Sequence, residues 1–242
     1  MTTLAQTLSL NALNKIVAHF DMREVGSPYL KLTNAMSPYP HGSCRIFTSA
    51  RLHKLVYIGI AAPPINMDSH MFFAFTAPDS AVPHFTLDSV LAGGHFAFHL
   101  DLIPRVDLGA NLAYMNSNFV PLTSHFDQAK KIEGLTAAQL SPLQYALMSP
   151  WMLAYRATEA AYAQVAPHID AYLDHWLGLV DNGVAAPAGV DAAALAARDQ
   201  ANRNAIFSYE VDKVWNQIER LNGKEQNAKL IEILRNQAIE TV

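Results

Sequence analysis

Residues 82–108 read VPHFTLDSVLAGGHFAFHLDLIPRVDL, and this stretch decides the fold class. Two runs, residues 84–90 and 95–102, lie on either side of Ala92-Gly93-Gly94. Both runs alternate in polarity with the period of two that is typical of a half-buried β-strand. Two adjacent glycines supply the positive φ angles that a tight hairpin turn requires. The stretch therefore predicts a β-hairpin.

The first strand of this hairpin carries chemically different groups on its two faces. Alternation places Phe85, Leu87 and Ser89 on one face, and His84, Thr86, Asp88 and Val90 on the other. The second face collects an imidazole, a hydroxyl and a carboxylate in an otherwise apolar sheet, and packing alone does not select such groups. We therefore predict a pocket over this face, with Asp88 near its centre.

Composition restricts the class of protein. The chain has 242 residues, about half of them apolar, and a formal net charge of −4, so it has no general attraction to nucleic acid or to an anionic membrane. The single cysteine, Cys44, excludes an intrachain disulfide. We see no secretory signal and no apolar run of the roughly 18 residues that a spanning helix needs. We expect a cytoplasmic protein with one domain over residues 1–242.

The order of the expected elements indicates the fold class. Further strands are predicted at residues 29–33, 45–50, 52–60, 70–76 and 151–156, with a turn at 38–42. Helices are predicted at residues 8–23, 111–118, 158–180 with a restart at Pro167, 190–204, 211–221 and 225–238, and residues 126–135 form a helix or a loop. Strands followed by helices indicate an α+β fold in which helices cover one mainly antiparallel sheet.

The usual motifs for nucleotide, nucleophile and metal chemistry do not occur in the sequence. No glycine-rich phosphate loop, no Gly-x-Ser-x-Gly and no His-Glu-x-x-His is present. His95 and His99 have a spacing of four, but in a strand this separates them by about 13 Å, which is too far for one ion. We therefore expect no metal site.

Several short elements resemble, in their order and spacing, the ferredoxin-dependent bilin reductase superfamily, and within it red chlorophyll catabolite reductase most closely. The elements are residues 70–88, Leu100-Asp101-Leu102, Arg105-Val106-Asp107-Leu108 followed by Asn111 and Tyr114, Ala154-Tyr155-Arg156, Tyr209-Glu210-Val211-Asp212 and Leu221-Asn222-Gly223. Two positions depart from the pattern. The histidine of bilin reductases falls on Met71, with His70 beside it on the other side of the strand. The chlorophyll catabolite enzymes have glutamate where this chain has Asp88.

The resemblance implies a three-layer α/β/α sandwich and the ferredoxin-dependent reduction of a linear tetrapyrrole, either a red chlorophyll catabolite-like pigment or a biliverdin-type bilin. Electrons would come from reduced ferredoxin, and no flavin, haem or metal would be bound. Asp88 and Asp212 would be the catalytic proton donors or hydrogen-bonding groups. The expected substrate-binding residues are His70, His84, Arg105 and Arg156, the arginines because a guanidinium binds a carboxylate in a bidentate manner.

Other interpretations of these residues remain open at this point. Asp212 could cap a helix that begins at Lys213, and Arg105 and Arg156 could be partners in surface salt bridges. The protein could be a non-catalytic tetrapyrrole carrier with the same fold, or a different small-molecule enzyme that uses the sheet pocket. Ferredoxin is acidic, so its docking predicts a basic patch near the pocket. A homodimer is one option for the oligomeric state.

Overall fold

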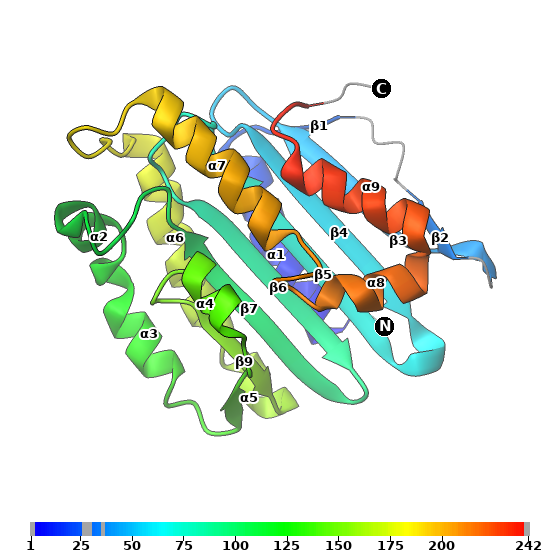
Figure 1. Ribbon diagram of the computed structural model, residues 1–242. Helices are drawn as coiled ribbons and strands as arrows, with labels where there is room; N and C mark the ends of the chain where they lie inside the picture. Colours follow the sequence, from blue (N-terminus) through cyan, green and yellow to red (C-terminus); the bar gives the residue numbers. More distant parts are fainter. Residues whose placement is uncertain (1–2, 26–30, 35–36, 240–242) are drawn as a thin grey trace.

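An antiparallel sheet forms the middle of the computed structural model, which describes residues 3–25, 31–34 and 37–239 (Figure 1). Within these residues the sheet has nine strands in the order β1-β3-β4-β5-β6-β7-β9-β8, and β2 pairs with β3. All of these pairs are antiparallel. The strands are β1 (Arg23–Val25), β2 (Leu32–Asn34), β3 (Ser37–Thr48), β4 (Lys54–Ala62), β5 (Met67–Phe75), β6 (His84–Ala92), β7 (His95–Ile103), β8 (Leu135–Ala137) and β9 (Leu153–Ala157).

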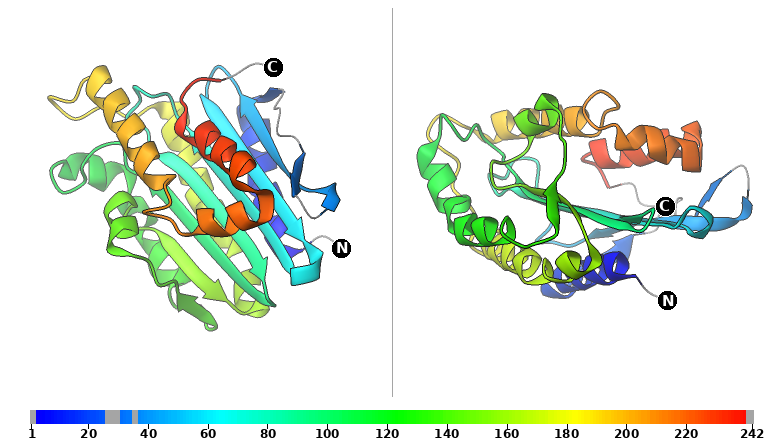
Figure 2. Two further views of the ribbon diagram at one scale, coloured as in Figure 1. Left: turned by 45° about the vertical axis from the view of Figure 1, so that its right-hand side comes forward. Right: turned by 90° about the horizontal axis from the view of Figure 1, so that it is seen from below.

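Helices cover both faces of the sheet, as the view along its edge shows (Figure 2). Helices α1, α5 and α6 lie on one face and α7, α8 and α9 on the other, so the predicted α/β/α sandwich is confirmed. No helix in the described ranges has both the length and the apolar character to cross a bilayer. The helices are α1 (Leu4–His19), α2 (Leu112–Asn118), α3 (Thr123–Ala129), α4 (Pro142–Leu147), α5 (Glu159–Ala163), α6 (Ala166–Asn182), α7 (Ala192–Ile206), α8 (Val214–Asn222), α9 (Lys224–Arg235) and the short 3-10 helices η1 (Pro63–Ile65) and η2 (Val120–Leu122).

The predicted hairpin is the pair β6 and β7. Gly93 and Gly94 form its turn with φ angles of 57° and 84°, a region that glycine reaches without a steric penalty. The predicted faces are also confirmed. Phe85 packs against Trp176 of α6, and Ser89 donates a hydrogen bond to the carbonyl oxygen of Ala5 in α1. The face that carries Asp88 is therefore turned toward α7 and α8.

Each face of the sheet has its own apolar core. On the α1 and α6 side, the rings of Phe72 and Phe85 stack at 5.7 Å, and Phe85 lies 5.5 Å from Trp176. On the α7 to α9 side, Phe73 packs edge-on against Phe207 at 4.9 Å. Burial of each of these large side chains contributes about 1.5–3 kcal/mol. Packing from both sides holds the strands that carry the pocket residues in fixed positions.

The prediction of a turn at residues 38–42 is wrong, because β3 runs through this segment. Gly42 pairs with Leu32 on one side and with Ile60 on the other. A Cβ atom at Gly42 would lie 2.4 Å from the carbonyl oxygen of Gly59. Gly42 therefore permits the close approach of β3 and β4. A glycine that is needed for strand packing and a glycine that is needed for a turn look the same in the sequence, and this explains the wrong prediction.

The first helix is displaced relative to the predicted range 8–23. It begins after Thr3, whose hydroxyl accepts a hydrogen bond from the amide of Gln6 at 3.0 Å and caps the helix. It ends at His19, and Arg23 already belongs to β1. Pairing of β1 with β3 thus overrides the helical periodicity of the last turn.

Two other predicted segments are divided. The range 158–180 forms two helices, and the second begins with Pro167 in its first turn, as predicted. In the range 126–135, α3 ends at Ala129 and β8 begins at Leu135. The short strand β8 extends the sheet beside β9.

Candidate functional site

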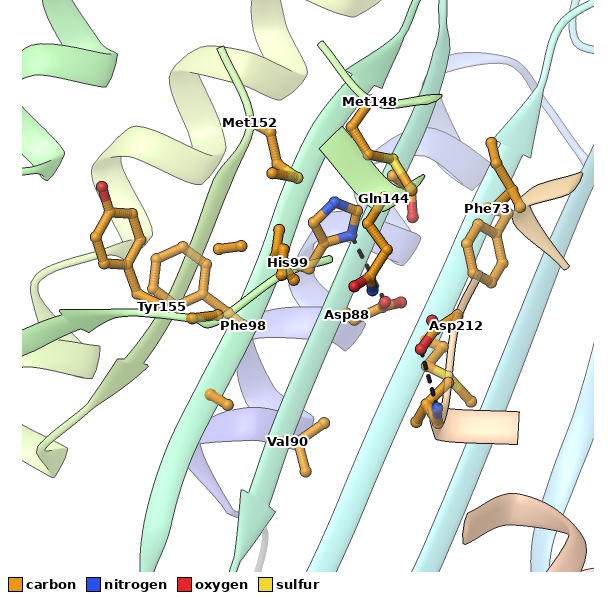
Figure 3. A pocket seen from close by; sticks show the side chains of 18 of the residues that line it. Phe73, Asp88, Val90, Phe98, His99, Gln144, Met148, Met152, Tyr155 and Asp212 are labelled. Atoms are coloured by element: carbon orange, nitrogen blue, oxygen red, sulfur yellow. Dashed lines mark hydrogen bonds and ion pairs between the residues drawn. The ribbon is translucent and has the colours of Figure 1, made fainter. Parts of the chain in front are cut away.

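A hollow lies over β6 and β7 on the side of the sheet that faces α7 and α8 (Figure 3). Strands β5, β6, β7 and β9 form its floor, α4 and the segment that follows α4 cover one side, and the connection between α7 and α8 forms the opposite wall. Its cavity volume is about 240 Å³. The hollow lies where the alternation of β6 predicts a pocket, and Asp88 is one of the residues that line it.

Asp88 and His99 face each other on the floor of the hollow. They are directly opposite in the register of β6 and β7, and Nδ1 of His99 lies 3.7 Å from Oδ2 of Asp88. The side chains are 19% exposed for His99 and 26% for Asp88. Among the described residues, Oδ1 of Asp88 and Nε2 of His99 are buried without a hydrogen-bond partner. The pair therefore has hydrogen-bonding capacity that the protein itself does not use.

Asp212 reaches the same region from the opposite wall (Figure 3). Its Oδ1 accepts a hydrogen bond from the amide of Val214 at 2.9 Å, at the start of α8. The capping interpretation is thus correct in part, although α8 begins one residue later than predicted. Burial is the main cause that raises the pKa of Asp212, and the negative charge of Asp88 acts in the same direction. Asp212 therefore retains its proton to a higher pH than an exposed aspartate.

The charges around His99 favour its protonated form. Burial lowers the pKa of His99, but the contact with Asp88 and the charges of Asp101 and Asp212 outweigh burial, so the pKa is raised above 6.5. Asp101 lies two residues along β7 from His99, on the same face of the sheet. It has no exposed surface and accepts hydrogen bonds from the amide and the hydroxyl of Ser149 at 2.8 and 2.5 Å. Burial raises the pKa of Asp101 to about 6. Three carboxyl groups thus surround one imidazole.

The rest of the hollow is mainly apolar. Met71, Met148 and Met152 line it, and thioether side chains adapt readily to the shape of a ligand. Two polar atoms in its walls, Oγ1 of Thr86 and Nε1 of Trp215, are buried and have no hydrogen-bond partner in the described part of the chain. An apolar hollow with a few convergent polar groups is typical of a small-molecule site.

The structure does not place His70 in this site. His70 is on the other face of β5, where Nδ1 lies 2.7 Å from the hydroxyl of Tyr57 and Nε2 lies 2.9 Å from Oδ1 of Asp68. It is 3% exposed and does not line the hollow. The structure therefore does not bring His70, a predicted substrate-binding residue, into the hollow, because alternation turns this side chain toward α1.

His84 shares a sheet face with Asp88 but is also outside the hollow. Its Nε2 lies 2.5 Å from Oδ1 of Asp199 in α7. Burial is the main cause that lowers the pKa of His84 to about 3, and the positive charge of Arg105 is the second cause. The ring is therefore neutral. The structure places His84, a predicted substrate-binding residue, in a buried polar cluster outside the hollow.

Arg105 belongs to the same cluster and is 2% exposed. It donates hydrogen bonds to Oγ1 of Thr76 at 3.0 Å and to the carbonyl oxygen of Pro78 at 2.7 Å, and lies 3.4 Å from Asp199. Its guanidinium is thus used to hold the β5–β6 connection against α7. Its ion pair is therefore buried and not at the surface, and Arg105, a predicted substrate-binding residue, does not line the hollow.

Arg156 is the predicted substrate-binding residue that does line the hollow. It lies on β9 and is exposed, and its side chain forms no hydrogen bond or ion pair within the described ranges. Its guanidinium is available to a carboxylate at the mouth.

Comparison with solved structures finds the same architecture in phytochromobilin synthase from tomato, whose crystal structure was determined in complex with biliverdin. The match has a TM-score of 0.75 and covers 97% of this chain and 85% of that chain. The chain shares its fold with tomato phytochromobilin synthase. The two sequences are 19% identical, so the likeness to the synthase concerns the fold. No protein-family model and no curated protein matches the sequence.

His99 is the site residue that the sequence argument missed. In the register of β6 and β7, Asp88 and His99 are cross-strand neighbours. A two-residue turn at Gly93 and Gly94 pairs residues whose numbers add up to 187, and 88 and 99 are such a pair. The register of the predicted hairpin could therefore have identified His99 from the sequence.

Proposed function

We propose that this protein reduces a linear tetrapyrrole with electrons from reduced ferredoxin. One observation carries the proposal: two carboxyl groups, Asp88 on the sheet and Asp212 on the facing wall, meet in an apolar hollow. The fold is shared with a synthase whose structure holds biliverdin. The sequence resemblance to bilin reductases, which includes both aspartates, supports the same reaction class.

The walls of the hollow suit a flat conjugated ligand. Methionine side chains and the ring of Phe73 offer polarizable surface to such a ligand. The unpartnered polar atoms of Thr86 and Trp215 are suited to the carbonyl and N–H groups of pyrrole-derived rings. A linear tetrapyrrole has both a flat conjugated surface and carbonyl and N–H groups.

In the proposed reaction, one double bond takes up two electrons and two protons. Ferredoxin delivers the electrons singly, and each electron makes the pigment more basic, so a proton follows each electron. Asp88 and Asp212 deliver the protons from the floor and from the wall, and solvent protonates them again. The raised pKa of Asp212 suits a proton donor near neutral pH.

The pigment class within this proposal depends on Arg156. It is the one lysine or arginine among the described residues that line the hollow. A single cationic side chain favours a pigment that presents one carboxylate on the β9 side. Independently, the sequence resemblance to red chlorophyll catabolite reductase favours a chlorophyll-derived pigment over biliverdin.

We expect Arg156→Gln to weaken pigment binding roughly tenfold, because a charge-assisted contact contributes about 1.4 kcal/mol or more. Arg23→Gln is the matched control, since Arg23 is exposed on β1 at the far edge of the sheet. Titration of both variants with the tighter-binding pigment measures the effect. Equal affinity of the two variants would exclude Arg156 as a carboxylate anchor.

The proposed function is tested by adding biliverdin or a red chlorophyll catabolite to the purified protein and recording the visible spectrum. A spectral shift at micromolar pigment and its further change after anaerobic addition of reduced ferredoxin are expected. Ala154→Trp should abolish the shift, because Ala154 lines the hollow beside His99. Ala163→Trp, exposed on α5, should not. A shift without turnover would indicate a carrier, and no shift with either pigment would refute the proposal.

A further inference from the structure

Asp88 has two direct cross-strand neighbours, and they differ in chemistry. In the register of the sheet, Met71 of β5 lies on one side of Asp88 and His99 of β7 on the other. All three side chains line the hollow. Of the two cross-strand neighbours of Asp88, only His99 carries an imidazole. The sheet thus places this imidazole beside the carboxyl group on the floor of the site.

Within the described residues, the polar contact of the His99 side chain is the one with Asp88. Nδ1 faces Asp88 at 3.7 Å, and Nε2 is buried without a partner within the described residues. A buried imidazole that only fills space costs desolvation, and an apolar residue would fill the same space without this cost. Its position is therefore explained by the carboxyl group that it faces.

The charged groups around His99 come from several packed elements. They are Asp88 on β6, Asp101 on β7 and Asp212 on the α7–α8 connection, with Arg156 of β9 farther along the lining of the hollow. The carboxyl groups favour an imidazolium, and the raised pKa of His99 is consistent with this environment. The site therefore holds a positive charge and a transferable proton next to Asp88.

We propose that His99 stores the proton that Asp88 passes to the ligand, and thus acts as a positioning residue for Asp88. This inference rests on the proposed function and adds a third group to its proton transfer. When the pigment accepts one electron from ferredoxin, Asp88 gives it one proton. The proton on Nδ1 of His99 then moves to Oδ2 of Asp88. The neutral imidazole takes up a proton from solvent, so charge and protons balance over the step.

Three variants test this role. His99→Gln removes the titratable group but keeps hydrogen-bonding capacity, and Met71→His/His99→Met moves the imidazole to the other neighbour of Asp88. His95→Gln is the matched control, because His95 is exposed at the turn end of the same strand. Thermal unfolding of each variant identifies any loss of fold, and the exchanged double variant keeps the test valid if His99→Gln is unstable.

The first readout does not require turnover. The spectrum of bound biliverdin is titrated with pH, since protonation of the pigment changes its visible absorption. We expect the transition of the His99→Gln complex to lie at higher pH than that of the wild type, because the substitution removes a positive charge that disfavours the protonated pigment. The transition of the exchanged variant should return toward that of the wild type, and that of His95→Gln should be unchanged. An identical transition in wild type and His99→Gln would overturn the role of His99 even if the proposed function is correct.

The second readout is the pH profile of turnover with reduced ferredoxin. In the wild type, kcat should fall as the pH rises through the raised pKa of His99, because the imidazolium is then lost. Near pH 7.5 we expect His99→Gln to lower kcat roughly 100-fold and to move the alkaline limb to lower pH. A fall in kcat with an unchanged profile would indicate a structural role only. Failure of the wild type to turn over would refute the proposed function but would leave the first readout interpretable.

Discussion

Replacement of Thr86 by valine should stabilise the free protein. The hydroxyl of Thr86 is in the wall of the hollow, the residue is 1% exposed, and Oγ1 has no hydrogen-bond partner in the described part of the chain. Valine has nearly the same shape and no hydroxyl. The substitution therefore removes a polar group that lost its water on folding and gained no partner.

The size of the effect follows from the cost of an unpartnered polar group. Burial of such a group costs about 1–3 kcal/mol. Replacement of the hydroxyl by the methyl group of valine removes most of this cost but not all of it, because the two side chains differ slightly in shape. We expect the free energy of unfolding to rise by about 1–2 kcal/mol. For a chain of this length, each kcal/mol corresponds to roughly 2–4 °C in Tm, so Tm should rise by roughly 2–8 °C.

The matched control is Thr76→Val. Thr76 is 4% exposed, but its hydroxyl donates to the carbonyl oxygen of Val82 at 2.9 Å and accepts from Arg105 at 3.0 Å. Its loss removes both of these buried hydrogen bonds and should lower stability by about 1–3 kcal/mol. Urea and thermal unfolding of both variants without pigment give the comparison. A loss of stability in Thr86→Val as large as that in Thr76→Val would show that the Thr86 hydroxyl is already satisfied, and would refute the reasoning.

Two further predictions concern buried carboxyl groups. Because burial raises the pKa of Asp101 to about 6 in the folded protein, the folded state binds more protons than the unfolded state between pH 4 and pH 6, and stability should fall by up to roughly 3 kcal/mol as the pH rises through this range. Asp101→Asn should flatten this part of the curve of unfolding free energy against pH, and an unchanged slope would contradict the assignment. Asp199→Asn should lower stability by about 3–5 kcal/mol, because it leaves the buried guanidinium groups of Arg105 and Arg203 without their carboxylate. Urea unfolding at neutral pH measures this loss, and a loss below about 1 kcal/mol would show that the ion pairs contribute little.

The parts of the fold that depend on neighbouring residues could be predicted from the sequence. The period of two in residues 84–90 assigns the faces of β6, and the two glycines at 93 and 94 fix the turn, so the location of Asp88 in a pocket follows from local rules. The same alternation excludes His70 from the pocket once Asp88 is placed in it, since the two strands pair His70 with Ser89, which faces α1.

The parts that depend on distant contacts could not be predicted in this way. His84 is bound by Asp199, which is 115 residues away in the chain, and nothing near His84 indicates that a helix brings a carboxylate to it. Arg105 is directed toward the same cluster rather than toward the hollow. A role for Asp212 beside Asp88 is implied by the family resemblance, because periodicity alone indicates only a helix start. Tertiary packing decides which polar groups are structural and which remain available to a ligand.

The most direct test of the account is an anaerobic single-turnover measurement that compares the wild type with Asp88→Asn/Asp212→Asn. Both proteins are loaded with the pigment that binds more tightly and mixed with reduced ferredoxin, and the visible spectrum is recorded over time. The account predicts that the wild type converts the bound pigment into a product with a shortened conjugated system. It predicts that the double variant binds the pigment and leaves it unreduced or reduces it at least 100-fold more slowly. Conversion by the double variant at the wild-type rate would contradict the claim that these two carboxyl groups supply the protons.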